Sequence, residues 1–231
     1  AAERAGAEGM RAWSGLLDLF FPPKCPFCGK VRDAAGGCPA CLDALARTGE
    51  ERAVRELAPG LRCAAPLWYE GAVREAILRF KFRGGVSAAG PLGEQIAQTA
   101  AEHFDGEFDG VTWVPVSSKR LRRRGYDQAR LLAESACKLW GAEPEPLLRK
   151  VRDNPAQSGL ENAARRRENV RGVYEALGSL SGRRILLIDD VCSTGSTLVS
   201  AAGALREAGA AGVVCAAAAF PRAEEENRGE K

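Results

Sequence analysis

Short apolar runs and helical patterns alternate along most of the chain. The apolar runs, which are typical of buried strands, lie at 63–69, 111–116, 185–188 and 213–220. Segments whose apolar residues recur every three or four positions, as on one face of a helix, lie between them at 73–80, 92–104, 128–140 and 197–208. Apolar runs of this kind are typical of parallel strands covered on both faces. The pattern predicts an α/β fold with a mainly parallel sheet flanked by helices.

Less regular segments divide the chain into unequal parts. A charged stretch at 47–56 indicates a solvated helix or linker, so we place a domain boundary near 46–60. We expect a disordered extension at 1–12, a small module at 13–46, an α/β domain at 60–222 and a disordered charged tail at 223–231. The apolar stretch at 16–21 contains Asp18 and is far shorter than the ~20 residues of a membrane span. We therefore expect no membrane span.

The overall charge and the histidine content narrow the chemistry. The formal net charge is only +3 over 231 residues, so a polyanionic partner must be argued from local clusters. The single histidine, His103, lies in a helical pattern and indicates a surface residue. Because Ser-His-Asp, Cys-His and multi-histidine metal sites need a histidine beside a specific partner, we set these classes aside.

Four of the eight cysteines form two C-x-x-C pairs that are separated by nine residues. Each pair can place two thiolates about 2.3 Å from one Zn²⁺, and glycines beside both pairs permit tight turns. Two disulfides or a redox dithiol are the alternatives, but no secretory signal and no thioredoxin-like βαβ context is recognisable. We predict one structural Zn²⁺ per chain, with the ligands Cys25, Cys28, Cys38 and Cys41.

The other four cysteines are scattered through apolar surroundings, at Cys63, Cys137, Cys192 and Cys215. Buried, reduced thiols are the expected state of such residues. This use of cysteine is typical of a cytoplasmic protein.

The most specific segment is RILLIDDVCSTGST, from Arg184 to Thr197. A buried strand ends in Asp189 and Asp190, and a loop of serine, threonine and glycine then opens a helix. Backbone N–H groups at a helix N-terminus can cradle a phosphate, and Gly195 allows close approach. Carboxylates at this edge of a parallel sheet can accept hydrogen bonds from vicinal ribose hydroxyls. The pattern indicates a ribose 5-phosphate ligand; a metal site or a helix-capping turn is the alternative.

The same segment resembles the phosphoribosyl pyrophosphate (PRPP) motif of type I phosphoribosyltransferases. The resemblance implies that Asp189 and Asp190 hold the ribose 2′- and 3′-hydroxyls, and that Mg²⁺ binds with PRPP. It also implies PRPP contacts from the loop that follows, at Val191, Cys192, Ser193, Thr194, Gly195, Ser196 and Thr197. At Cys192 and Ser193 the family more often has an apolar residue and threonine.

Further segments resemble the ComF family, competence-associated proteins that join a zinc finger to a phosphoribosyltransferase domain. These segments are Phe21-Pro22, the two cysteine pairs, Lys81-Phe82, Val114-Pro115-Val116, Arg124 to Gln128, Gln157, and Arg167 to Gly172. The resemblance covers residues 13–222. Where the family usually has Phe-Asn, this chain has Tyr126 and Asp127, so a carboxylate replaces an amide.

The strand at 111–116 leads into a basic cluster. In the enzyme fold this is the place of the pyrophosphate loop, for which we predict Ser117, Ser118, Lys119 and Arg124. We predict Lys119, with Asp189 and Asp190, to be catalytic. The remaining arginines form either a solvated basic face or a contact with a nucleic-acid backbone, and they are Arg120, Arg122 and Arg123.

The polar, basic stretch at 150–171 is too long for an ordinary connection. A lid over the site is the natural expectation, with a disordered basic loop as the alternative. Gln157, Arg167 and Asn169 match the flexible loop of the family.

Two functions are consistent with these patterns. The first is a phosphoribosyltransferase that binds PRPP and serves DNA uptake or nucleotide metabolism. The second is a non-catalytic, PRPP-responsive competence factor whose zinc module and arginines contact single-stranded DNA or a DNA-uptake helicase. The acceptor would lie near 69–83, where no residue pattern identifies it, and the oligomeric state is left open.

Overall fold

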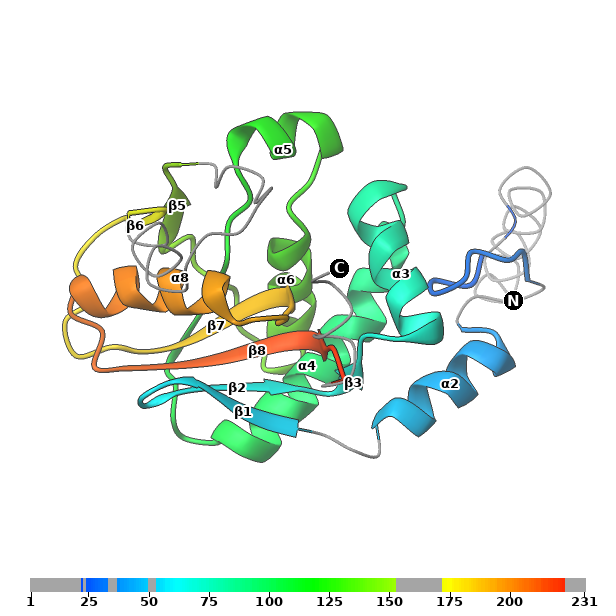
Figure 1. The fold of residues 1–231 in the computed structure, drawn as a ribbon, viewed down its shortest axis with the longest axis horizontal. Helices are drawn as coiled ribbons and strands as arrows, with labels where there is room; N and C mark the ends of the chain where they lie inside the picture. The colour runs from blue at the N-terminus through cyan, green and yellow to red at the C-terminus, as the bar shows by residue number, and fades with distance from the viewer. Residues whose placement is uncertain (1–21, 23, 33–36, 50–52, 153–171, 223–231) are drawn as a thin grey trace, which may run out of the picture.

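The structure, a computed structural model, describes residues 22, 24–32, 37–49, 53–152 and 172–222. Its centre is a sheet with the strand order β1-β2-β8-β7-β4, and β3 also pairs with β8 (Figure 1). These strands are β1 (Ala53–Ala58), β2 (Leu61–Ala65), β3 (Leu67–Trp68), β4 (Gly110–Trp113), β7 (Arg184–Val191) and β8 (Gly212–Phe220). β1 is antiparallel to β2, whereas the other pairs are parallel. The predicted α/β fold with a mainly parallel sheet is confirmed.

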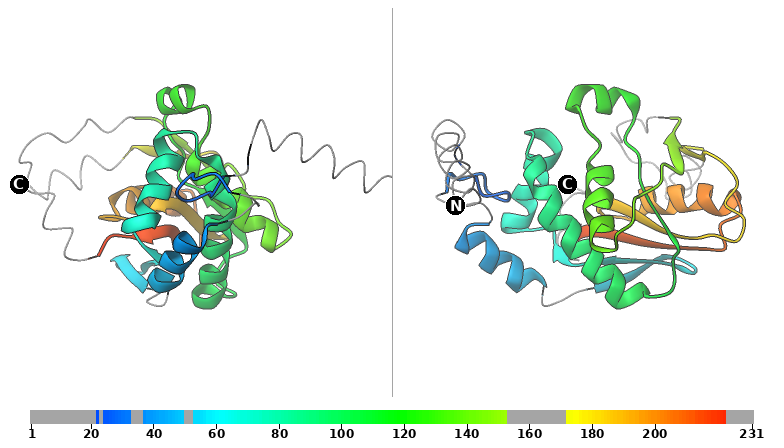
Figure 2. Two further views of the ribbon diagram at one scale, coloured as in Figure 1. Left: turned by 90° about the vertical axis from the view of Figure 1, so that its right-hand side faces the viewer. Right: turned by 180° about the vertical axis from the view of Figure 1, so that it is seen from behind.

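Helices cover both faces of the sheet (Figures 1 and 2). One core cluster joins one face to α3 (Gly71–Phe82), α4 (Ala89–Phe104) and α6 (Gln128–Leu139), and a second joins the other face to α8 (Ser196–Glu207). In β7, Leu186 and Ile188 belong to the first cluster, and Ile185 and Leu187 to the second. All four side chains are 0% exposed, as expected of a strand covered on both faces.

The charged stretch at 47–56 is helical at its start and a strand at its end. Residues 47–49 close α2 (Pro39–Gly49), in keeping with the expected helix, whereas residues 53–56 belong to β1, which begins at Ala53 and pairs with β2. Edge strands tolerate charged side chains on their open side, which explains the misleading composition. Arg55 is held in the fold because its Nη2 donates to the Pro221 carbonyl at 2.7 Å and its guanidinium lies 4.4 Å from the Phe220 ring centre. The α/β sheet therefore starts at Ala53.

Two further elements escape the apolar pattern. A short helix, α5 (Ser118–Arg124), contains none of the buried residues that make a helix recognisable. β5 (Leu148–Lys150) pairs antiparallel with β6 (Tyr174–Ala176), and the Val151 N–H donates to the Val173 carbonyl at 2.9 Å beside this pair. Gln157, Arg167 and Asn169 lie outside the described residues, as do the segments 1–12 and 223–231.

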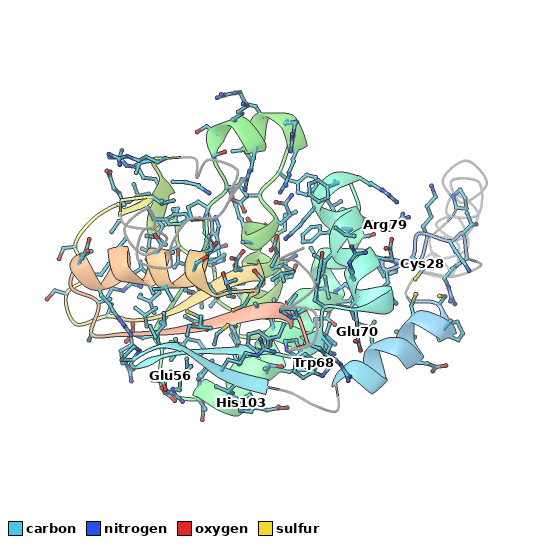
Figure 3. The ribbon with its side chains drawn as sticks, viewed as in Figure 1. Cys28, Glu56, Trp68, Glu70, Arg79 and His103 are labelled. Carbon is cyan, nitrogen blue, oxygen red and sulfur yellow. The ribbon has the colours of Figure 1, made fainter. Side chains whose placement is uncertain are left out.

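The cysteine module packs on the α/β domain. Cys25, Phe27 and Cys41 are at most 5% exposed and belong to the same core cluster as α3 and α4. Gly29 has φ +71°, and a Cβ atom there would lie 1.8 Å from the Arg79 guanidinium. Figure 3 shows Arg79 on α3 beside the segment that carries Cys28. α3 is thus the element on which the module docks.

No helix in the described part of the chain is long and apolar enough to cross a membrane.

Candidate functional site

The four predicted zinc ligands lie together. Their sulfur atoms are all within 4.8 Å of one another, and Sγ of Cys28 lies 3.7 Å from Sγ of Cys38. Four thiolates placed tetrahedrally at about 2.3 Å from Zn²⁺ are about 3.8 Å apart, so the cluster has the size of a zinc site. Among the described residues it is the one group of three or more Cys, His, Asp or Glu residues with such spacing.

Backbone donors prepare part of this cluster for a cation. Burial opposes ionisation of Cys25, but hydrogen bonds from the backbone of Cys28 and Cys38 outweigh burial and lower its pKa to about 6. The Cys38 N–H donates to Sγ of Cys25 at 3.3 Å. Burial and the neighbouring thiols raise the pKa of Cys41 instead. Four crowded thiols cannot all ionise alone, and a divalent cation resolves this conflict.

The predicted ribose residues lie in the last part of β7, and the predicted phosphate residues follow its end. The N–H of Asp190 donates to Oδ1 of Asp189 at 2.8 Å, and both carboxylates line a cavity of about 430 Å³. Ser193, Thr194, Ser196 and Thr197 are exposed around the N-terminus of α8, whereas Cys192 is 2% exposed, in keeping with a buried thiol. Backbone donors at a helix start, beside two carboxylates, suit a sugar phosphate.

Gly195 is required for this loop by two independent constraints. Its φ is +72°, in the left-handed region that favours glycine. A Cβ atom there would also lie 2.8 Å from Cδ2 of Leu57, which comes from β1. The edge strand that the sequence pattern missed therefore supports the phosphate loop.

Lys81, in the last turn of α3, lines the same cavity and was not assigned to the site from the sequence. Its Nζ lies 2.8 Å from Oδ1 of Asp190, and the two side chains are 22% and 15% exposed. Burial opposes the charge of Lys81, but Asp190 and Asp189 outweigh it, so the pKa of Lys81 is raised and the ammonium is retained. The signal in the sequence was the pair Lys81-Phe82, which matched the ComF pattern without an assigned role.

Asp189, unlike Lys81, is shifted toward its neutral form. Burial, and then repulsion by Asp190, raise its pKa from 3.8 to about 8, although Lys81 partly opposes this effect. The two adjacent carboxyl groups therefore share one ammonium, and Asp189 binds a proton more readily than an ordinary aspartate.

The predicted pyrophosphate loop is only partly brought to the cavity. The hydroxyl of Ser117 caps α5 by accepting the Arg120 N–H at 3.4 Å, while Ser118 and Lys119 are exposed and are not among the lining residues. The arginines on the other positions of α5 line the cavity instead, namely Arg120, Arg123 and Arg124. Arg122 is exposed and does not line it. Arg123 and Arg124 lie three and four positions after Arg120, so the three share one face of α5, and Lys119 lies outside this face.

Asp127 is fully used as an acceptor. It caps α6, and its carboxylate accepts the N–H of Val116 at 2.9 Å and of Arg130 at 3.3 Å. Both partners are backbone donors, so a carboxylate serves where the family usually has an amide. The bond to Val116 fixes the segment that follows β4 against α6.

The comparisons with known proteins follow the same division of the chain. The family model of the phosphoribosyl transferase domain matches residues 109–230, and that of the double zinc ribbon domain matches residues 16–55. The competence protein ComFC of Bacillus subtilis (strain 168) is 28% identical over 191 residues, which cover 82% of this chain and 74% of that protein. The chain belongs to the ComF family of phosphoribosyl transferase-domain proteins.

Other ComF-type relatives match shorter stretches. The competence protein F of Haemophilus influenzae is 36% identical over 106 residues, which cover 44% of this chain and 45% of that protein. Among solved structures, the glutamine PRPP amidotransferase of B. subtilis shares 30% identity over 58% of this chain and 26% of that chain, with a TM-score of 0.38. The matched transferase domain begins at Asp109, so α3 and Lys81 precede it.

Cys28→Ser should abolish stoichiometric zinc binding, because a hydroxyl is a poor replacement for a thiolate ligand. We expect about one Zn²⁺ per chain in the wild type and well below half of that in the variant, measured by elemental analysis. Cys137→Ala, which changes a buried thiol on α6, is the control and should keep the metal. Full zinc in Cys28→Ser would refute the ligand assignment.

Asp189→Asn should stabilise the ligand-free protein more at high pH than at low pH. A carboxyl whose pKa rises from 3.8 to about 8 on folding destabilises the folded state as pH rises through that window. The amide avoids this cost, so its advantage in Tm should grow by at least about 2 °C between about pH 6 and pH 9. Asp109→Asn is the control, since the pKa of Asp109 is lowered and this carboxyl group does not titrate between about pH 6 and pH 9. A pH-independent difference for Asp189→Asn contradicts the buried acid.

Proposed function

We propose that this protein is a phosphoribosyltransferase that binds PRPP with Mg²⁺ and transfers the phosphoribosyl group to a nitrogen acceptor. The observation that carries the proposal is the convergence of two adjacent carboxylates, the N-terminus of α8 and several basic side chains on one cavity of about 430 Å³. A ribose with a phosphate at one end and a pyrophosphate at the other matches this distribution of acceptors and donors.

Each part of the ligand has a place in this proposal. The 5-phosphate binds to the loop at 192–197, and Asp189 and Asp190 accept hydrogen bonds from the 2′- and 3′-hydroxyls. The pyrophosphate lies against the segment 116–118 and the cavity-lining arginines. Cationic and N–H donors at this place stabilise the charge that grows on the leaving group. The role of Lys119 stays a prediction, since its side chain is exposed and does not line the cavity.

Mg²⁺ fits this site only together with the ligand. Carboxylate oxygens are suitable donors, but among the described residues Asp189 and Asp190 have no third acidic neighbour within ligand spacing. Most of its ligands would be oxygens of PRPP and water, with one or both carboxylates beside them. When bound, Mg²⁺ neutralises charge on the pyrophosphate.

The names of the relatives support a role of the proposed activity in DNA uptake. They include competence proteins and the DNA utilization protein YhgH of Salmonella typhi, which is 32% identical over 46% of this chain. We propose a cytoplasmic step of DNA uptake or nucleotide metabolism, in keeping with eight cysteines of which none forms a disulfide.

A second candidate function, binding of single-stranded DNA, is favoured by α5. This helix has no buried residue, and Arg120, Arg122 and Arg123 are all exposed on it. A basic, solvated helix at the mouth of a cavity can track a nucleic-acid backbone. A DNA-uptake helicase is a further partner that this surface could reach.

The double change Asp189→Asn with Asp190→Asn should weaken PRPP binding at least about a hundredfold. Above about pH 8, where both groups are ionised, each carboxylate gives a charge-assisted hydrogen bond worth roughly 1.5–3 kcal/mol, and an amide gives much less. Calorimetric titration with PRPP and Mg²⁺ measures the effect. Asp109→Asn, at the opposite end of the sheet where Asp109 pairs with Arg184, is the control and should bind normally. Unchanged affinity in the double variant would place the ribose elsewhere.

If α5 binds DNA, replacing Arg120, Arg122 and Arg123 with alanine should lower the slope of log affinity against log salt by up to about 2, at ~0.7 per phosphate contact. Arg122→Ala alone should lower it by about 0.7 and leave PRPP affinity unchanged, because Arg122 does not line the cavity. Fluorescence anisotropy with a labelled oligonucleotide measures both slopes. If the wild type does not bind the oligonucleotide at low salt, this candidate function is refuted.

A further inference from the structure

The ammonium group of Lys81 is buried beside the place where the ribose is proposed to bind. Its Nζ lies 2.8 Å from Oδ1 of Asp190, and the side chain is only 22% exposed. Asp190 is also the carboxylate that is proposed to accept a ribose hydroxyl. Lys81 and the ribose would therefore share Asp190 as an acceptor.

A bound ribose brings new hydrogen-bond donors to Asp190. Hydroxyl groups can fill the acceptor positions of Asp190, but they are neutral and bring no partner for the ammonium. A largely buried ammonium needs an anion or several acceptors near it. In PRPP the pyrophosphate is attached to C1, next to the C2 hydroxyl, and it supplies such an anion.

We propose that Lys81 is a catalytic residue that exchanges Asp190 for an oxygen of the pyrophosphate when PRPP binds. This inference rests on the proposed function and gives α3 a part in it. In the free protein Lys81 neutralises the carboxylates that hold the ribose, and in the complex it neutralises the leaving group.

The surroundings of Lys81 favour it over the other cations for this role. Lys119 is exposed and does not line the cavity, and Arg120 and Arg123 line it but are exposed to water. Charge–charge interactions are weakened by solvent and salt at exposed positions and much less at buried ones. Arg124 is engaged with Gln128, to which its Nη1 donates at 2.7 Å.

The step in which Lys81 acts is the displacement at C1. The bond from C1 to the pyrophosphate oxygen breaks, and its electron pair stays on that oxygen. The acceptor nitrogen forms the new bond to C1 and releases its proton to solvent. Lys81 makes no covalent bond and keeps its protons, and it stabilises the negative charge on the departing oxygen.

The test compares two ligands that differ only in the pyrophosphate. Wild type, Lys81→Met and Lys81→Arg are titrated calorimetrically with PRPP and with ribose 5-phosphate, both in the presence of Mg²⁺. Lys81→Met should weaken PRPP binding about 10- to 100-fold and change ribose 5-phosphate binding by less than about threefold. Lys81→Arg should keep most of the PRPP affinity, and Lys138→Met, on the exposed end of α6, should bind both ligands normally.

The outcomes separate this inference from the function on which it rests. Equal losses of affinity for both ligands in Lys81→Met would show that the lysine only positions Asp190, and would overturn the inference but not the proposed function. Unchanged PRPP affinity in this variant would do the same. A wild type that binds neither ligand would overturn the proposed function and the inference with it. If Lys81→Met fails to fold, Lys81→Gln takes its place and is judged by the same criteria.

Discussion

Burial of β7 on both faces is the constraint on which the site depends. Four consecutive side chains of this strand are completely removed from water, and the carboxyl groups of Asp189 and Asp190 follow near its C-terminal end, beyond the last residue that pairs with β4. Carboxylates at the end of such a strand are poorly hydrated, which raises the pKa of Asp189 and draws Lys81 to Asp190. The same desolvation makes them strong acceptors for the hydroxyls of a ligand.

α3 connects the zinc ribbon to this end of the sheet. On one side, Arg79 fills the space above Gly29 in the cysteine module. On the other side, Phe80 stacks on Tyr126, whose hydroxyl donates to the Phe80 carbonyl at 2.5 Å, and Lys81 reaches Asp190. Because buried cysteines of the module belong to the same core cluster as α3, the free energy of zinc binding also stabilises the helix that presents Lys81.

The charges around the cavity differ in their exposure to water. The side chains of Lys81 and Asp190 are 22% and 15% exposed, whereas Arg120 and Arg123 of α5 are exposed. Exposed cations attract an anion from a distance, and charges that are less exposed to water interact more strongly at close range. Asp127 fixes two segments beside the cavity relative to each other, since it links the segment after β4 to the start of α6.

Local sequence patterns determined the buried strands, the paired cysteines and the strand-carboxylate-loop-helix segment at 184–197, because each depends on residues close together in the chain. Only the tertiary structure decided the rest. β1 was hidden because an edge strand needs no apolar run, and its Leu57 limits residue 195 to glycine. The contact of Lys81 with Asp190 joins residues far apart in sequence, and the choice of Arg120 and Arg123 over Lys119 depends on how α5 is turned toward the cavity. Contacts outside the helix set its orientation. A short helix with no buried residue has no apolar periodicity from which that orientation could be predicted.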